Sequence, residues 1–307
     1  MLPFLTTCGP NLRILQVPGI YSLLADHKEL LSLLGDGPMT RLETHYFYEG
    51  VGAADHDIAE MVSSSSHWTH IDISGCGWAG SSTAAAIVDH SVHLENLDLS
   101  ACDMLSSQDL QLILSKAEKL RVFEASRSLS ESQASRGPSL SAQDLVEIEW
   151  ATSSLEVFRC PIDVPRPDYH VPLKYHDSEW RSASLLTCHE VQRKVYRHLA
   201  QQTQLKELYT GKGWNVDWED EDCLWYSLEL SLGSGLDELK DMKCLESLNV
   251  RLMSHNIGAL ELEWMANNWP SLKHVYGICQ RGKDRDLNMT HWLWNNSPVW
   301  NQQCDWY

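Results

Sequence analysis

The chain has 307 residues, of which 43% are hydrophobic and 21% are charged, as in an average globular protein. This length exceeds the size at which a single compact core usually stops growing, so we expect either two globular domains or one elongated array of repeats. No apolar run approaches the ~20 residues of a membrane span, and the formal net charge of −18 argues against a nucleic-acid partner, because phosphate contacts need clustered Lys and Arg.

Nine cysteines are scattered along the chain without a Cys-x-x-Cys pair, and the stretch 1–8 lacks a basic secretory leader. Disulfides are rare where no secretory route is indicated. We therefore expect reduced, mostly buried thiols and a cytoplasmic or nuclear protein.

Apolar triplets of the form Leu-x-x-Leu-x-Leu recur along the chain and predict short strands. The three clearest copies start at Trp68, Leu94 and Leu120, in steps of 26 residues. The other copies start at Leu12, Leu42 (with His45 and Phe47), Leu155, Leu205, Trp225 (with Leu228 and Leu230), Leu245 and Leu272.

Helices are expected between these strands, at 23–34, 82–90, 141–151, 189–202 and 260–268. Two segments interrupt the spacing: 126–138 is rich in Ser, and 161–184 contains Pro161, Pro165, Pro167 and Pro172, so both are expected to be loop insertions. The Trp-rich stretch 279–307 is expected to cap the last repeat, although an exposed aromatic contact surface is an alternative.

The segment 94–114 illustrates one repeat. Leu97 and Leu99 point from the strand into the core, and the thiol of Cys102 packs beside the next repeat as a compact apolar group. Ser106 or Ser107 caps a helix whose inner face carries Leu110, Ile113 and Leu114. Neither the strand nor the helix can bury its apolar side alone, so the units must stack.

The sequence Leu-x-x-Leu-Asp-Leu-Ser-x-Cys at 94–102, together with the Leu-Ser-x-x-Asp-Leu start of its helix, resembles the cysteine-containing leucine-rich repeats of F-box proteins. The stretches 188–209 and 260–273 look like the repeat region of fungal F-box-like proteins. The resemblance covers about residues 10–280. It implies an α/β leucine-rich-repeat solenoid over 1–307, a single domain of nine or ten irregular repeats. A curved parallel sheet would form its concave side and helices its convex side.

The resemblance also implies a non-enzymatic protein-interaction module, the substrate-recognition or adaptor part of an F-box-type ubiquitin ligase. We expect the first repeat strand near residue 12, so the residues before it are not expected to form an F-box. A Skp1-type adaptor is therefore expected as a partner only if a longer product carries that segment. The alternative is a ubiquitin-independent scaffold or inhibitor-like leucine-rich-repeat protein.

In such a solenoid the residues between the buried leucines point out from the concave face. Asp72, Asp98 and Glu124 are expected on consecutive strands, where the carboxylates repel one another and favour a Lys or Arg from a protein partner; the alternative is that they are ordinary solvated positions. On this reasoning, Asp98→Lys would abolish binding and leave the melting temperature nearly unchanged. The full set of expected partner contacts is His70, Asp72, Asn96, Asp98, Glu124, Arg159, Tyr209, Glu229, Asn249, Arg251 and Tyr276.

Other patterns do not indicate chemistry. His67 and His70 have a spacing found in metal sites, but no third ligand lies at a companion spacing. Cys188 and His189 are adjacent at an expected helix start, where a thiol and its base rarely align. The acidic run 217–222 lacks the turn glycine of a calcium loop. We therefore expect no metal, no cofactor and no catalytic residue.

Overall fold

The computed structural model describes residues 13–16, 39–44, 55–126, 137–164, 178–211, 227–250, 253–255 and 257–278. The chain divides into two compact units. Unit 1 comprises Met1–Leu140 and Trp150–Leu155, and unit 2 comprises Ser141–Glu149 and Glu156–Tyr307. Within the described residues the chain is an α/β protein with nine parallel strands that follow one another in chain order, five in unit 1 and four in unit 2.

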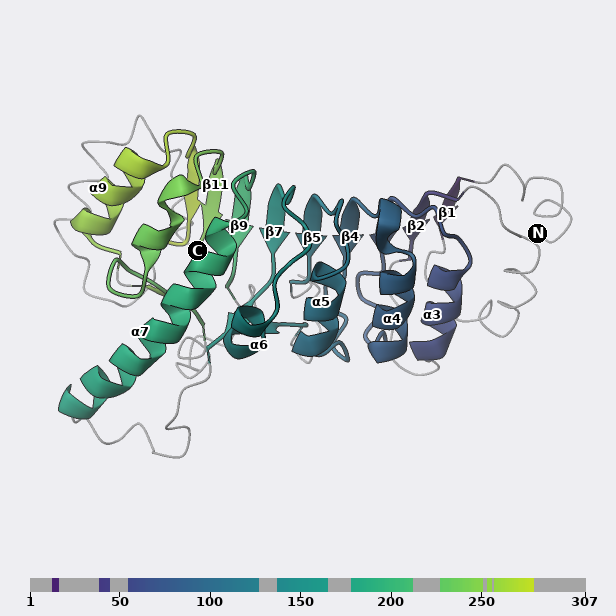
Figure 1. Cartoon of the computed structure of the whole chain (residues 1–307), viewed down its shortest axis with the longest axis horizontal. Coiled ribbons are helices and arrows are strands. Elements are labelled where there is room, and N and C mark those ends of the chain that lie inside the picture. Colours follow the sequence, from purple (N-terminus) through teal and green to yellow (C-terminus); the bar gives the residue numbers. More distant parts are fainter. Residues whose placement is uncertain are drawn as a thin grey trace, which may run out of the picture. The chain divides into compact units, whose positions relative to one another are not determined.

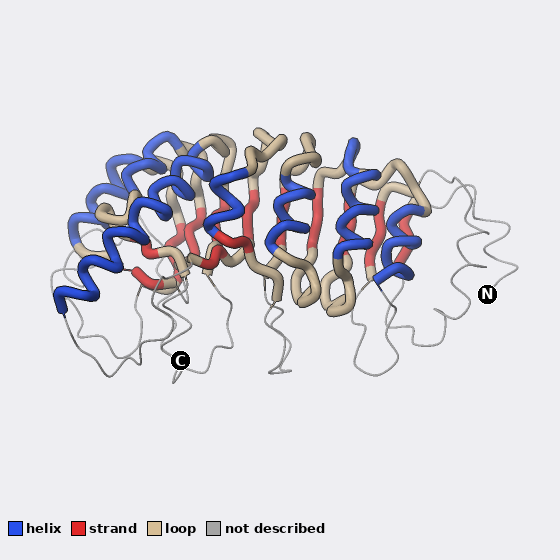
Figure 2. The backbone as a smooth tube through the Cα atoms, turned by 60° about the horizontal axis from the view of Figure 1, so that its bottom comes forward, coloured by secondary structure: helices blue, strands red, loops and turns tan. Residues whose placement is uncertain are grey.

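Unit 1 alternates parallel strands with helices that lie on one face of its sheet (Figures 1 and 2). Its elements are β1 (Ile14–Gln16), β2 (Arg41–Glu43), α3 (Asp55–Ser63), β3 (His70–Asp72), α4 (Ser81–Asp89), η3 (Ser91–His93), β4 (Asn96–Asp98), α5 (Ser107–Leu114) and β5 (Val122–Glu124). The two-residue β6 (Leu140–Ser141) follows at the boundary of the units. We call the sheet face opposite the helices the open face.

The middle residue of each strand in unit 1 aligns with the middle residue of the next. This row consists of Leu15, Leu42, Ile71, Leu97 and Phe123, all buried. Burying each such side chain contributes about 1.5–3 kcal/mol, and the row lies between the sheet and the helices. Leu97 and Phe123 are neighbours on parallel strands, as the 26-residue step between the triplets at Leu94 and Leu120 predicts.

Helix caps in unit 1 follow from the sequence. Ser106 caps α5 by accepting a hydrogen bond from the Asp109 amide, and the Asp109 carboxylate accepts one from the Ser106 amide. This capping box confirms the first of the two expected cap residues. The cap of α4 is less usual, because Gly80 has no capping side chain and the Asp55 carboxylate from α3 replaces it.

The buried thiols of unit 1 face the preceding repeat. The prediction from the sequence, which placed them beside the following repeat, was wrong. The Cys102 Sγ donates to the Ile73 carbonyl at 3.3 Å. The Cys76 Sγ lies 3.9 Å from the Thr44 hydroxyl oxygen.

Unit 2 contains a second set of parallel strands, in the order β7-β9-β11-β13. Its elements are α6 (Ala142–Glu147), β7 (Val157–Arg159), β8 (Ile162–Asp163), α7 (Ser178–Ala200), β9 (Glu207–Tyr209), β10 (Glu229–Leu230), η4 (Leu236–Asp241), β11 (Ser247–Asn249), β12 (Ser254–His255), α9 (Ala259–Asn268) and β13 (His274–Tyr276). The aligned middle residues Phe158, Leu208, Leu248 and Val275 are buried. The Trp269 indole at the end of α9 donates to the Leu239 carbonyl of η4 at 2.9 Å.

Two of the expected strand triplets are wrong in register or place. The strand near residue 42 has Leu42 at its middle, so its triplet is Met39-x-x-Leu42-x-Thr44, with all three residues buried. Small Thr44 fills a place for which the larger apolar Phe47 was expected. The triplet at Trp225 does not add a strand to the main ladder, because β10 pairs with β12 in a separate small sheet while β9 pairs directly with β11.

Helix positions agree in part with the sequence. The expected helices at 82–90 and 260–268 are confirmed as α4 and α9, and α6 is shorter than expected. Helix α7 begins at residue 178, inside the expected insertion 161–184 and after its last proline, Pro172. Helix α3 was not expected, although Ile58, Met61 and Val62 carry helical spacing and are buried.

Several expectations fall outside the described residues: the helix at 23–34, most of the insertion 126–138, the acidic run 217–222 and the Trp-rich segment 279–307. Among the described helices, none combines the length and the apolar character needed to cross a membrane.

Candidate functional site

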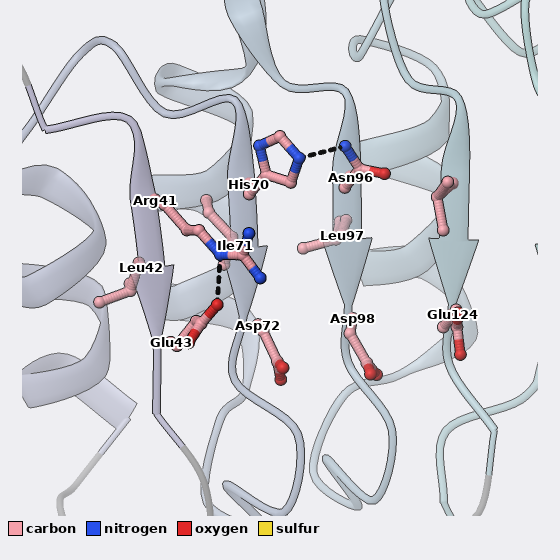
Figure 3. Close-up of a pocket in the computed structure, with 11 residues that line it drawn as sticks. Arg41, Leu42, Glu43, His70, Ile71, Asp72, Asn96, Leu97, Asp98 and Glu124 are labelled. Carbon is pink, nitrogen blue, oxygen red and sulfur yellow. Dashed lines mark hydrogen bonds and ion pairs between the residues drawn. The ribbon is translucent and has the colours of Figure 1, made fainter. Parts of the chain in front are cut away.

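The open face of unit 1 carries four carboxylates in register on four neighbouring strands. Glu43 aligns with Asp72, Asp72 with Asp98, and Asp98 with Glu124. Each is the last residue of its strand, so all four lie at the carboxyl-terminal end of the sheet (Figure 3). Neighbouring strands are about 4.8 Å apart, so this acidic row is about 14 Å long. The expected alignment of Asp72, Asp98 and Glu124 on consecutive strands is confirmed.

Glu43 was missed by the sequence analysis because its strand was placed three residues too late. It is the most buried member of the acidic row and pairs with Arg41 of the same strand and with Gln16 of β1. The triplet Met39-x-x-Leu42 was the signal that could have located it. Glu43 therefore ends the row next to a cation of the same chain.

Asp72 and Asp98 also have a structural role. The Asp72 Oδ1 accepts from the Ser74 amide at 3.0 Å, and the Asp98 Oδ1 accepts from the Ser100 amide at 2.8 Å. A carboxylate that bonds the amide two residues on forms an Asx turn, which ends the strand. Asp98→Lys would remove this acceptor at a cost of about 0.5–1.5 kcal/mol, so the structure predicts a lower melting temperature where the sequence predicted an unchanged one. Asp98→Asn keeps the acceptor and removes only the charge.

His70 and Asn96 lie beside the acidic row, on the same face. The Asn96 Nδ2 lies 2.8 Å from the His70 Nε2, and the His70 Nδ1 lies 2.8 Å from the Thr69 hydroxyl. That hydroxyl donates to the Thr40 carbonyl, so it accepts from His70. The network fits a neutral imidazole with its proton on Nδ1. Burial, reinforced by the charge of Arg41, lowers the pKa of His70, which favours the same neutral form.

The depression over these strands is shallow. Its volume is about 170 Å³, and its lining comes from β2, β3, β4 and β5, with the acidic row along one side. Small-molecule sites usually enclose roughly 300–1,000 Å³. The shape fits one or two side chains of an incoming protein segment better than a whole metabolite.

The expected contacts in unit 2 have a different character. Arg159, Tyr209, Asn249 and Tyr276 align in one row, as expected from their triplets. Tyr209 is buried, and Arg159 pairs with Glu207 of β9 at 2.7 Å. Arg251 lies outside the described residues.

Glu229 does not belong to this row, because β10 lies in the small sheet with β12. It is buried, and its carboxylate lies 3.0 Å from the His189 Nε2 and accepts from the Ser231 hydroxyl at 2.9 Å. A nucleophilic serine needs the histidine as its base. Here the carboxylate lies between the serine and the histidine, so this cluster has the bonding of a structural network and not of a catalytic triad.

In unit 2, the residues that directly precede the parallel strands alternate in charge from one strand to the next. Lys206 pairs with Glu156 at 2.7 Å, and Lys273 pairs with Glu246 at 2.6 Å. Each residue of this alternating row has opposite charges as neighbours. In the acidic row of unit 1, by contrast, carboxylates align with carboxylates on the neighbouring strands, and like charges that face each other across strands repel.

The structure also locates the histidines and cysteines that the sequence did not assign to a functional site. The His67 ring stacks on the His93 ring at 6.2 Å. Cys188 is buried in the interior of α7 and not at its start, so a helix N-terminus does not activate it. Cys76, Cys102, Cys160 and Cys188 are buried and form no disulfide, as expected. Within the described ranges, no group of three or more His, Cys, Asp or Glu side chains could hold a metal ion.

The chain matches no model of a known protein family, and it matches no curated protein either.

Proposed function

We propose that this chain is a non-enzymatic leucine-rich-repeat solenoid that binds a basic segment of another protein on the open face of unit 1. The observation that carries the proposal is the register of Glu43, Asp72, Asp98 and Glu124 on consecutive strands. An incoming Lys or Arg relieves the repulsion among these carboxylates, so the same charges that destabilise the free face favour the complex.

Three further features support this proposal. The depression beside the row has the size of a side chain. The neighbouring His70 is held neutral, so it adds no competing positive charge. The net charge of −18 attracts a basic partner over distances of about a Debye length.

The experiment compares partners captured by the full chain and by charge variants. Asp98→Asn with Glu124→Gln removes two charges from the row and keeps the shape and the turn acceptor. Glu156→Gln with Glu246→Gln removes two charges from the alternating row of unit 2 and serves as the matched control. Quantitative mass spectrometry measures each captured protein.

We expect the first variant to lose the specific partner about tenfold, which corresponds to ~1.4 kcal/mol, while the control retains it. Equal recovery of that partner by both variants would show that the acidic row does not bind it.

We further propose that the binding serves substrate recognition in an F-box-type ubiquitin ligase, and this proposal rests only on the sequence resemblance of the repeats. Recovery of a Skp1-type adaptor and a cullin with the natural full-length product would support this role. Recovery of a partner without those subunits would instead support a ubiquitin-independent scaffold or inhibitor.

A further inference from the structure

Two large apolar side chains are exposed at the same position of consecutive repeats in unit 1. Trp78 and Met104 each follow a buried cysteine, Cys76 or Cys102, by two residues. Their exposed fractions are 52% for Trp78 and 60% for Met104. Scattered apolar residues on a surface are ordinary, but these two recur in equivalent turns of neighbouring repeats. We call them the apolar pair.

The apolar pair lies at the same edge of the sheet as the acidic row. Asp72 and Asp98 end their strands, and Trp78 and Met104 follow them by six residues. Figure 3 shows that these turns leave the sheet at the end where the carboxylates lie. Six residues span at most about 20 Å when extended.

The turns are far from extended. The Cys76 amide bonds the Ile73 carbonyl at 3.0 Å, and the Cys102 amide bonds the Leu99 carbonyl at 3.1 Å. The apolar pair and the acidic row are therefore within reach of one short peptide segment.

We propose that the apolar pair and the acidic row form one surface, and that its partner is a protein segment in which Lys or Arg residues are followed within a few positions by a large apolar residue. This inference rests on the proposed function. Trp is the residue type most enriched among those that dominate interface energetics, and the adjoining carboxylates select a basic segment. A second copy of this chain is a poor occupant, because its net charge of −18 repels the same surface.

The test uses fluorescein-labelled synthetic peptides of equal length and fluorescence anisotropy with the full chain. Their cores are Arg-Ser-Arg-Ser-Leu-Phe, Arg-Ser-Arg-Ser-Ser-Ser and Glu-Ser-Glu-Ser-Leu-Phe. The protein variants are Trp78→Ser with Met104→Ser, Asp98→Asn with Glu124→Gln, and the control Leu260→Ser. Leu260 is also exposed, at 71%, but lies on α9 of unit 2.

We expect the wild type to bind the basic peptide with the apolar end about tenfold tighter than the purely basic peptide, and the acidic peptide weakest. Trp78→Ser with Met104→Ser should remove that tenfold advantage and leave the affinity for the purely basic peptide unchanged. Leu260→Ser should change neither affinity.

The outcomes separate the two proposals. If the advantage of the apolar end is missing in the wild type or persists in Trp78→Ser with Met104→Ser, the apolar pair is not part of the site. If the purely basic peptide binds Asp98→Asn with Glu124→Gln as tightly as the wild type, or no peptide binds the wild type with Kd below about 1 mM, the proposed function fails. A wild type that dimerises in sedimentation through the apolar pair would identify a second copy as the occupant and overturn the inference.

Discussion

The cap of α4 by a residue of the preceding helix allows a quantitative test of how the repeats stabilise one another. The Asp55 carboxylate accepts hydrogen bonds from the amides of Gly80, Ser82 and Thr83 at 2.8–2.9 Å, and from the Thr83 hydroxyl at 2.7 Å. Asp55→Ala removes all of them and leaves the first amides of α4 without this acceptor. We therefore expect Asp55→Ala to lower the free energy of unfolding.

The magnitude follows from the pKa of Asp55. Burial disfavours the ionised form, but the hydrogen bonds from Thr83, Gly80 and Ser82 outweigh it and lower the pKa from 3.8 to about 2. The fall of the pKa from 3.8 to about 2 corresponds to at most ~2.5 kcal/mol, and solvent screening of this partly exposed group reduces it to about 1 kcal/mol. Loss of a helix cap costs a similar amount, so Asp55→Ala should cost about 1–2 kcal/mol at pH 7.

The assay is urea unfolding followed by circular dichroism at pH 7 and at pH 3. Because the folded-state pKa is depressed, this stabilisation is complete above pH 3.8 and is lost as the pH falls towards 2. The electrostatic difference between wild type and Asp55→Ala should therefore shrink by about half at pH 3. Asp57→Ala removes the same charge from the same turn of α3 and is the control. Equal losses of unfolding free energy in Asp55→Ala and Asp57→Ala would refute the inter-repeat cap. A difference between wild type and Asp55→Ala that does not change with pH would refute it as well.

Three further predictions concern unit 1 and Cys244. Ala101 has a positive φ of 58°, at the position that Gly75 occupies in the preceding repeat. Ala101→Gly should therefore raise the free energy of unfolding by about 1 kcal/mol, and Gly75→Ala should lower it. Urea unfolding that shows changes of the opposite sign would contradict this. Burial raises the pKa of Cys102 well above its usual value, so alkylation mapped by mass spectrometry should be at least about tenfold slower at Cys102 than at half-buried Cys244, and equal rates would count against a rigid core. Burial lowers the pKa of His70 from 6.5, so His70 gains its positive charge only in more acidic solution, and the affinity for the basic peptides should fall there. His70→Gln should remove this pH dependence of the affinity. If the dependence persists in the variant, His70 is not its cause.

The strands were the most predictable part of the fold. A buried residue must lie at the middle of each three-residue strand, and the spacing of Leu97 and its equivalents makes that position visible in the sequence. The prediction was wrong where the third position of a triplet is polar, as at Thr44, because apolar character alone then favours the wrong register. It was also wrong at Leu230, because an apolar alternation fits both a strand of the main ladder and a strand of a small separate sheet.

The acidic row was predictable for the same reason as the strands, since its members adjoin the buried middle residues. The roles of individual side chains were not predictable. The bond between Asp98 and the Ser100 amide depends on the turn geometry, and the Asp55 cap joins residues 25–28 positions apart only after the repeats stack. The burial of Glu229 beside His189 depends on the path of α7, which no repeat pattern describes.

The most direct test of the binding proposal is carboxylate footprinting with a water-soluble carbodiimide and an amine, read by mass spectrometry. The Arg-Ser-Arg-Ser-Leu-Phe peptide should strongly reduce labelling of Asp72, Asp98 and Glu124, and leave labelling of the exposed Glu118 unchanged. Unchanged labelling of those three carboxylates in the presence of bound peptide would show that the basic segment binds elsewhere.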